Sequence, residues 1–134
     1  MDVSKYAGYF HDGALIDIKQ VGDKIELFLS SAEMDPEDLQ DDIPLDDYDR
    51  IKGILHLEGI RKITRNEQPF VGNLNMEHKR GGILDLEITE HTVTLLIDWR
   101  DYNPLYGSVD CSEIMIEADK IYWENKPDLI DPYW

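Results

Sequence analysis

The chain has 134 residues, with 29 acidic and 13 basic side chains and a formal net charge of −16 at pH 7. Apolar residues make up 42% of the sequence, a share typical of folded proteins, so wholesale disorder is disfavoured. The length predicts a single domain over residues 1–134 with one core. The acidic balance argues against nucleic-acid phosphates and anionic membrane surfaces as partners.

The sequence also bears on the compartment. Cys111 is the one cysteine, so an intrachain disulfide is excluded and secretion gains no support. The first residues lack the basic start and apolar stretch of a signal peptide, and no apolar run is long enough to cross a bilayer. We therefore expect a cytoplasmic protein.

Alternating apolar residues predict a hairpin near the start of the chain. Residues 14–19 and 25–29 each carry an apolar face with a period of two, and residues 22–23, Gly-Asp, form the turn signal between them. The expected inward side chains of the first strand are Ala14, Ile16 and Ile18.

Residues 35–49 depart from this pattern. They hold eight acids and no base, and they join the second strand to the third. Asp35 before Pro36 predicts a helix N-cap and a short helix near residues 36–40, which Pro44 limits. Long connections in compact domains often carry function, so this acidic loop is the first candidate site.

The rest of the chain again predicts strands. We expect two strands at residues 51–64 broken by Gly59, a short strand near residues 74–77, a second hairpin over residues 83–99, and one or two strands over residues 113–123. Together with the first hairpin this makes about eight strands and no long helix, which favours a mainly β fold, an antiparallel sandwich or a strongly curved sheet.

Some core side chains of the second half follow from the same alternation. Leu84, Leu86 and Ile88 are expected to point inward from the second hairpin, together with Trp99. Either Tyr122 or Trp123 is expected to join them. The last residues, 127–134, are expected to pack back onto the sheet; the alternative is a contact surface for a partner or for a second copy in a homodimer.

The acids and the exposed aromatic residues favour protein binding. Carboxylates on one surface steer a cationic partner, and tyrosines are frequent in interface hot spots. The predicted partner-binding residues are Asp38, Asp41, Asp42, Asp46 and Asp47 in the loop, Asp85 and Glu87 on the second hairpin, and Tyr102 and Tyr106 in a polar loop. The alternatives for the acidic loop are a solvated segment that keeps the protein soluble and a loose Ca²⁺ or Mg²⁺ site, although the EF-hand pattern is absent.

An enzyme or a metal protein centred on His11 and Asp12 is the alternative function. Some phosphohydrolases use a His-Asp pair as metal ligands, but the other histidines here show no ligand spacing. We therefore favour a structural role, in which His11 or Asp12 bonds the backbone at the start of the first strand. Nucleophile-elbow, Walker and Gly-x-Gly-x-x-Gly motifs are absent, which favours a non-catalytic protein without a cofactor.

The opening Tyr9-Phe10-His11-Asp12-Gly13, followed by the apolar alternation of residues 15–18 and 25–27, resembles a hairpin of small uncharacterised bacterial proteins. Some of those proteins are grouped with immunity proteins of toxin–antitoxin neighbourhoods. The resemblance implies a non-catalytic neutraliser and transfers no catalytic residue. The expected function is thus binding of a basic protein, most sharply a cationic toxin or nuclease, with DNA mimicry as a close variant.

Overall fold

The structure is a computed structural model that describes residues 2–101 and 109–132. Within these residues the fold is mainly β, as predicted, with seven strands and two short 3-10 helices. The elements in chain order are η1 (Val3–Phe10), β1 (Ala14–Val21), β2 (Lys24–Ser30), η2 (Pro36–Asp38), β3 (Lys52–Arg65), β4 (Gln68–Pro69), β5 (Arg80–Ile88), β6 (Thr92–Arg100) and β7 (Asp110–Asn125).

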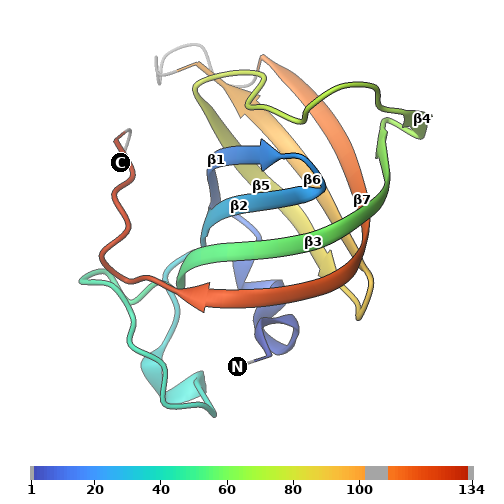
Figure 1. Cartoon of the computed structure of the whole chain (residues 1–134). Coiled ribbons are helices and arrows are strands. Elements are labelled where there is room, and N and C mark those ends of the chain that lie inside the picture. The colour runs from blue at the N-terminus through green and yellow to red at the C-terminus, as the bar shows by residue number, and fades with distance from the viewer. Residues whose placement is uncertain (1, 102–108, 133–134) are drawn as a thin grey trace.

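Six of the strands form a closed antiparallel barrel in the order β1-β2-β3-β7-β6-β5, with β5 pairing back onto β1 (Figure 1). Each half is a three-stranded meander, and the two long strands β3 and β7 join the halves. β4 is a two-residue extension paired with the end of β3. The predicted sandwich of about eight strands is therefore wrong, because closure pairs the free edges that a sandwich would leave.

The two predicted hairpins are confirmed as β1–β2 and β5–β6. Between them, β3 is one continuous strand rather than two. Gly59 takes a left-handed φ of +68°, and the β3–β7 register shifts between Ile60 and Lys62, so the strand bends without ending. The strand predicted near residues 74–77 is wrong: the Leu74 N–H donates to the Gln20 side chain at 2.7 Å rather than to another strand.

Two β-bulges change which side chains point inward. The register shifts between Leu15 and Asp17 in β1, and between Ile83 and Asp85 in β5. Leu15 and Ile83 are buried, whereas Ile16 and Leu84, both predicted to point inward, are only half-buried. An extra residue in one strand reverses the alternation, so the inward prediction for these two residues is wrong.

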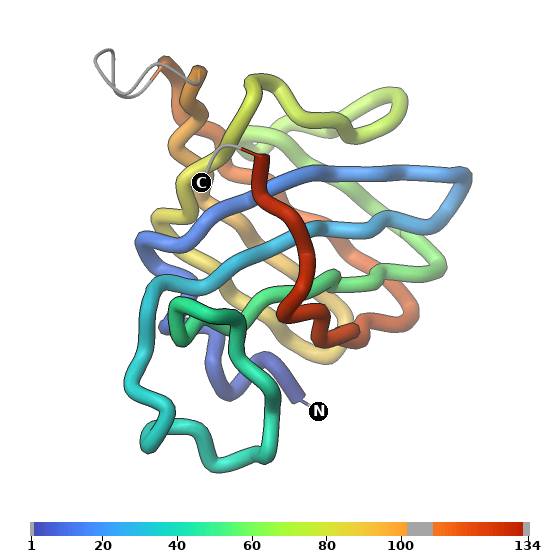
Figure 2. Tube along the Cα trace, turned by 90° about the vertical axis from the view of Figure 1, so that its left-hand side faces the viewer, coloured from blue at the N-terminus to red at the C-terminus, as the bar shows by residue number. Residues whose placement is uncertain are grey.

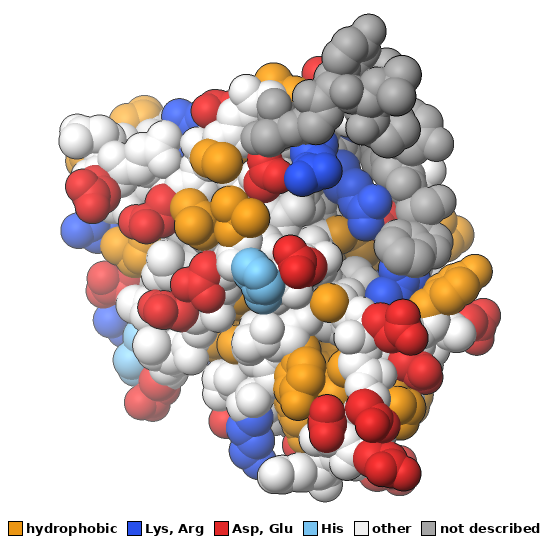
Figure 3. All heavy atoms as spheres, turned by 180° about the vertical axis from the view of Figure 1, so that it is seen from behind, with side chains coloured by type: hydrophobic (Ala, Val, Ile, Leu, Met, Phe, Trp, Pro, Cys, Tyr) orange, Lys and Arg blue, Asp and Glu red, His pale blue; other side chains and the backbone are white. Residues whose placement is uncertain are grey.

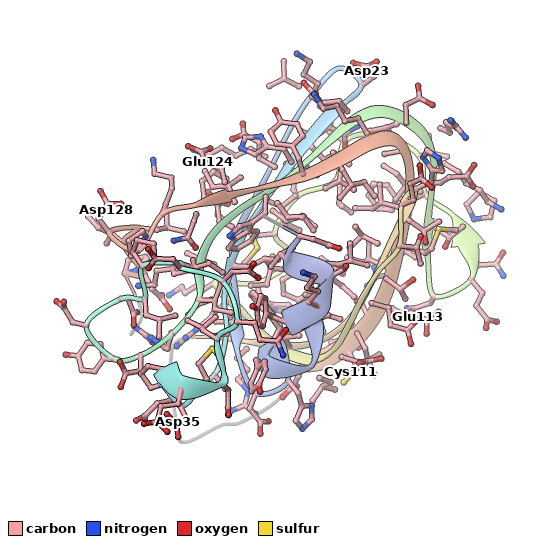
Figure 4. The ribbon with its side chains drawn as sticks, turned by 90° about the horizontal axis from the view of Figure 1, so that it is seen from below. Asp23, Asp35, Cys111, Glu113, Glu124 and Asp128 are labelled. Atoms are coloured by element: carbon pink, nitrogen blue, oxygen red, sulfur yellow. The ribbon has the colours of Figure 1, made fainter. Side chains whose placement is uncertain are left out.

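Helix η1 covers one end of the barrel (Figure 4). Its residues Val3, Tyr6 and Phe10 are buried, and the Phe10 ring meets the Trp123 ring edge-on at 5.9 Å between centroids. Trp99 is fully buried as predicted, and of the two aromatic alternatives in β7 it is Trp123 that joins the core. In the described residues no helix has the length and apolar character needed to span a lipid bilayer.

The C-terminal segment, residues 126–132, crosses the outer side of β1 and β2 (Figure 2). Arg80 Nη2 lies 2.8 Å from Asp131 Oδ2, and the Asp131 side chain is 2% exposed. The prediction that the end of the chain packs back onto the sheet is therefore confirmed up to residue 132. We call this segment the strap.

Candidate protein-binding surface

The acidic loop lies beside η1, at the covered end of the barrel (Figures 1 and 4). Backbone hydrogen bonds connect its two ends, from Ser31 N–H to the Ile51 carbonyl at 2.8 Å and from Met34 N–H to the Asp49 carbonyl at 3.0 Å. Leu39, Ile43 and Leu45 pack against the core from within it. The loop is thus a folded part of the domain.

The predicted helix start is also present in this loop. Asp35 Oδ1 accepts the Glu37 N–H at 3.0 Å, so Asp35 is the N-cap that the sequence indicated. The helix itself, η2, is a single 3-10 turn, shorter than the predicted residues 36–40.

Tyr6 of η1 anchors the middle of the loop. Its hydroxyl donates to Asp41 Oδ2 at 2.6 Å and accepts the backbone N–H groups of Gln40 at 3.1 Å and Asp41 at 3.2 Å. These bonds join two segments that are far apart in the sequence. Asp41 is therefore half-buried and bound within the protein, although it was predicted to face a partner.

Asp46 organises the second half of the loop. Its side chain is 4% exposed; Oδ2 accepts from Arg50 Nε at 2.8 Å and lies 3.5 Å from Lys52 Nζ. Oδ1 accepts the N–H groups of Tyr48 and Arg50, both at 2.9 Å. Burial opposes ionisation, but the hydrogen bonds from Arg50 and Tyr48 outweigh it and hold the pKa of Asp46 below its ordinary value. The Asp46 side chain is therefore buried and bound within the protein, although it was predicted to face a partner.

The remaining acids of the loop face solvent. In the part of the chain that the structure describes, none of them forms an ion pair with a lysine or arginine. Figure 3 shows acidic side chains gathered around apolar ones at the lower right, where the loop lies. We call these acids, together with the exposed Glu33 just before the loop, the acidic patch; it comprises Glu33, Asp35, Glu37, Asp38, Asp42, Asp47 and Asp49.

The field of the patch acts on a neighbouring tyrosine. The negative charge of Asp38 raises the pKa of Tyr9, with smaller contributions from desolvation and from hydrogen bonding to Asp38. Tyr9 belongs to η1, so the acidic patch borders that helix.

Several carboxylates on the barrel wall lie beside cations instead. Glu58 is 3.5 Å from Lys24 Nζ and 4.0 Å from Lys120 Nζ. Arg61 approaches Glu117 at 3.8 Å and also pairs with Asp119. Most of the ion-paired lysines and arginines among the described residues therefore contact carboxylates of the barrel, and only Arg50 and Lys52 contact a carboxylate of the loop.

The predicted residues of the second hairpin occupy a different surface. Asp85 and Glu87 are exposed on β5, opposite Leu96 and Thr94 of β6. They belong to the barrel wall rather than to the loop. Tyr102 and Tyr106 lie outside the described residues.

His11 and Asp12 make the contacts expected of a structural pair. His11 Nδ1 lies 2.5 Å from the Leu84 carbonyl oxygen, and the Asp12 N–H donates to the Ile83 carbonyl at 2.9 Å. Both contacts hold the end of η1 on β5 beside its bulge. Among the described residues no group of three or more His, Cys, Asp or Glu side chains could hold a metal ion, so this pair gains no further ligand there.

No protein-family model, curated protein or solved structure matches this chain. The resemblance of the opening hairpin to immunity proteins therefore stays a prediction.

Proposed function

We propose that the protein is a non-catalytic binding module that captures a basic protein through the acidic patch. The observation that carries this proposal is the concentration of exposed carboxylates in one folded loop, none of which is ion-paired with a lysine or arginine among the described residues. Like charges held close together repel each other in the free protein. A cationic partner removes that repulsion on binding, and the field of the patch speeds the encounter.

The loop is already held in shape before any partner arrives. Tyr6 anchors its middle and Asp46 its second half, both through hydrogen bonds of ordinary length. Binding therefore does not have to order the segment, which would otherwise lower affinity. Asp41 and Asp46, whose side chains are bound within the protein, thus hold the acidic patch in position.

Aromatic side chains accompany the carboxylates. Tyr48 is 58% exposed, and the guanidinium of Arg50 lies 5.2 Å from its ring centroid. Tyr9 is half-buried beside Asp38. Tyrosine next to charge is a common composition for interface hot spots, so the patch offers apolar contact as well as charge.

A cationic toxin or nuclease is the partner class that this surface fits best. A nuclease, or a toxin that acts on nucleic acid, needs basic residues to bind phosphates, and a carboxylate surface competes for those residues directly. In the DNA-mimicry variant of this proposal, the carboxylates of the patch take the place that nucleic-acid phosphates occupy on the partner. Neutralisation of the partner would follow from blocking that basic surface.

The test is a pull-down from a lysate of the producing cells, with three baits and identification by mass spectrometry. The first bait is the natural chain, and the second carries Asp38→Asn, Asp42→Asn and Asp47→Asn. The third is a matched control, Asp23→Asn with Glu67→Gln and Glu113→Gln, which removes the same charge from exposed acids elsewhere. In Figure 4, Asp23 and Glu113 lie far from Asp35 of the patch.

We expect one basic protein to be retained by the natural chain and the control and to be lost by the loop variant. Retention should also fall steeply as salt is raised. A fourth bait, Asp85→Asn with Glu87→Gln, reports whether the contact extends onto the barrel wall. Equal retention by the loop variant and the natural chain, or no basic protein on the natural chain at low salt, would overturn the proposal.

A further inference from the structure

Some lysines of this chain form ion pairs with carboxylates, and others do not. Every arginine lies in an ion pair, as do Lys24, Lys52 and Lys120. In the described part of the chain, the other lysines have no carboxylate within ion-pairing distance; they are Lys5, Lys19, Lys62, Lys79 and Lys126. In a protein with 29 acidic side chains, unpaired lysines call for an explanation.

Three of these lysines line one groove. Lys19, Lys79 and Lys126 surround a cavity of about 630 Å³ between the outer side of the β1–β2 hairpin and the strap. Figure 2 shows the strap crossing both strands at this place. The volume falls in the range of pockets that hold small organic ligands.

The groove also has an apolar lining. It is contributed by Ile16, Phe28 and Met76 on the barrel side and by Leu129 and Ile130 of the strap. The bulge in β1 is what brings Ile16 to the outside of the barrel. Lys19 Nζ lies 5.0 Å from the Phe28 ring centroid, so a cation and an aromatic face are adjacent.

The walls of the groove are held in place. The Lys126 N–H donates to the Lys52 carbonyl at 2.8 Å where the strap begins, and Arg80 binds Asp131 near its end. Two carboxylates, Asp17 and Asp128, also line the groove. Asp17 Oδ1 accepts the N–H of Ile18 at 2.8 Å, so it is partly committed to its own strand.

We propose that this groove binds a small amphipathic organic anion. Its ring or short alkyl body would lie on Phe28, Ile16 and Met76, and its carboxylate, phosphate or sulfonate would meet Lys19 with Lys79 or Lys126. The ligand has to be small, because an acidic polymer would extend beyond the lysines onto the acidic surface. At physiological ionic strength charges are screened over about 8 Å, so the local lysines dominate within the groove.

The probe is 8-anilinonaphthalene-1-sulfonate, an aromatic sulfonate whose fluorescence rises when it is bound. Titrated onto the full chain, it is expected to bind at one site per chain and to be displaced by decanoate at a much lower concentration than by methyl decanoate, which lacks the charge. The variant Lys19→Gln with Lys126→Gln should bind it at least about tenfold more weakly, a difference of roughly 1.4 kcal/mol. The matched control, Lys5→Gln with Lys62→Gln, removes the same charge from unpaired lysines outside the groove and should bind like the natural chain.

The neutral analogue N-phenyl-1-naphthylamine separates loss of charge recognition from loss of the fold. It should bind the natural chain and the Lys19/Lys126 variant equally, since it uses only the apolar lining. Equal weakening of the sulfonate by both lysine pairs, displacement by methyl decanoate as readily as by decanoate, or non-saturable binding to the natural chain would overturn the proposal. Because the acidic patch lies outside the groove, the pull-down and this titration fail or succeed independently.

Discussion

Asp46 and Arg50 form a buried ion pair inside the most acidic segment of the chain. Arg50 Nη2 lies 2.7 Å from Asp46 Oδ2, and the two side chains are 5% and 4% exposed. The same carboxylate caps the backbone of the turn that separates the two residues. One acid of the loop therefore shapes the turn, while the nearby acids Asp47 and Asp49 stay exposed to solvent.

Asp46→Asn should destabilise the fold strongly. The substitution removes the negative charge from between Arg50 and Lys52, both of which are buried. Breaking a buried pair from one side costs about 3 kcal/mol. Urea unfolding should show this loss, whereas Asp47→Asn, at the exposed neighbour, should change the free energy of unfolding by no more than about 0.5 kcal/mol. Equal effects of the two substitutions would contradict the assignment.

The same pair predicts a pH dependence in acid. The pKa of Asp46 is lower in the folded protein than its ordinary value of 3.8, so the unfolded chain takes up the proton first. The stabilisation is complete above the unfolded pKa and is lost as pH falls through the folded one. From about pH 5 to pH 3, the natural chain should therefore lose more stability than the Asp46→Asn variant. Parallel stability curves for the two proteins would show that Asp46 does not titrate in this way.

Tyr6→Phe should loosen the acidic loop without unfolding the barrel. The hydroxyl that is removed forms hydrogen bonds with Asp41 Oδ2 and with two backbone N–H groups. We therefore expect the free energy of unfolding to fall by about 1–2 kcal/mol. Hydrogen exchange should accelerate at Gln40 and Asp41 and remain slow at the paired amides of β6. Uniform acceleration across the barrel would mean that Tyr6 acts through the core alone.

Neutralising the acidic patch should stabilise the free protein at low salt. Asp38, Asp42 and Asp47 repel one another and their neighbours, and relief of such repulsion is worth about 0.3 kcal/mol per residue. Thermal unfolding of the triple asparagine variant should therefore occur at a higher temperature in dilute buffer, with the gain vanishing in strong salt. A gain that persists at high salt would point to a cause other than charge.

Gly53→Ala should disrupt the junction of β3 and β7. An added Cβ would lie 2.2 Å from the Glu124 carbonyl oxygen and 2.7 Å from Trp123 Cζ2. We expect the free energy of unfolding to fall by about 1–3 kcal/mol, as it does at other overpacked sites. Gly8→Ala is the control, because an added Cβ there has no neighbour within 4 Å among the described residues. If both variants unfold at the same denaturant concentration, the junction is more adaptable than its geometry indicates.

Local sequence patterns were sufficient for the hairpins and for the acidic loop. Residues 14–29 predicted β1 and β2 because a period of two and a Gly-Asp turn are both short-range signals. Asp35 before Pro36 predicted the N-cap of η2 for the same reason. The density of acids in residues 35–49 also identified the loop as the segment with uncompensated charge.

Helix η1 went unpredicted, although one signal for it exists in the sequence. Asp2 caps it by accepting the N–H of Ser4 at 3.0 Å, the pattern that was recognised at Asp35. The helix is stabilised mainly by burial of Tyr6 and Phe10 against the barrel end, which depends on strands far along the chain. The groove lysines were missed for a similar reason, since Lys19 and Lys126 meet only when the strap crosses β1.

The sequence by itself determined the mainly β class, the hairpins and the acidic character of the loop, because each depends on neighbouring residues. Only the tertiary structure decided that the sheet closes into a barrel, since closure rests on pairings between distant strands such as Leu15 with Gly81. It also decided that Ile16 turns outward and that Asp46 turns inward. A bulge and a buried arginine reverse what alternation and charge predict, because burial depends on which distant groups arrive at the same place.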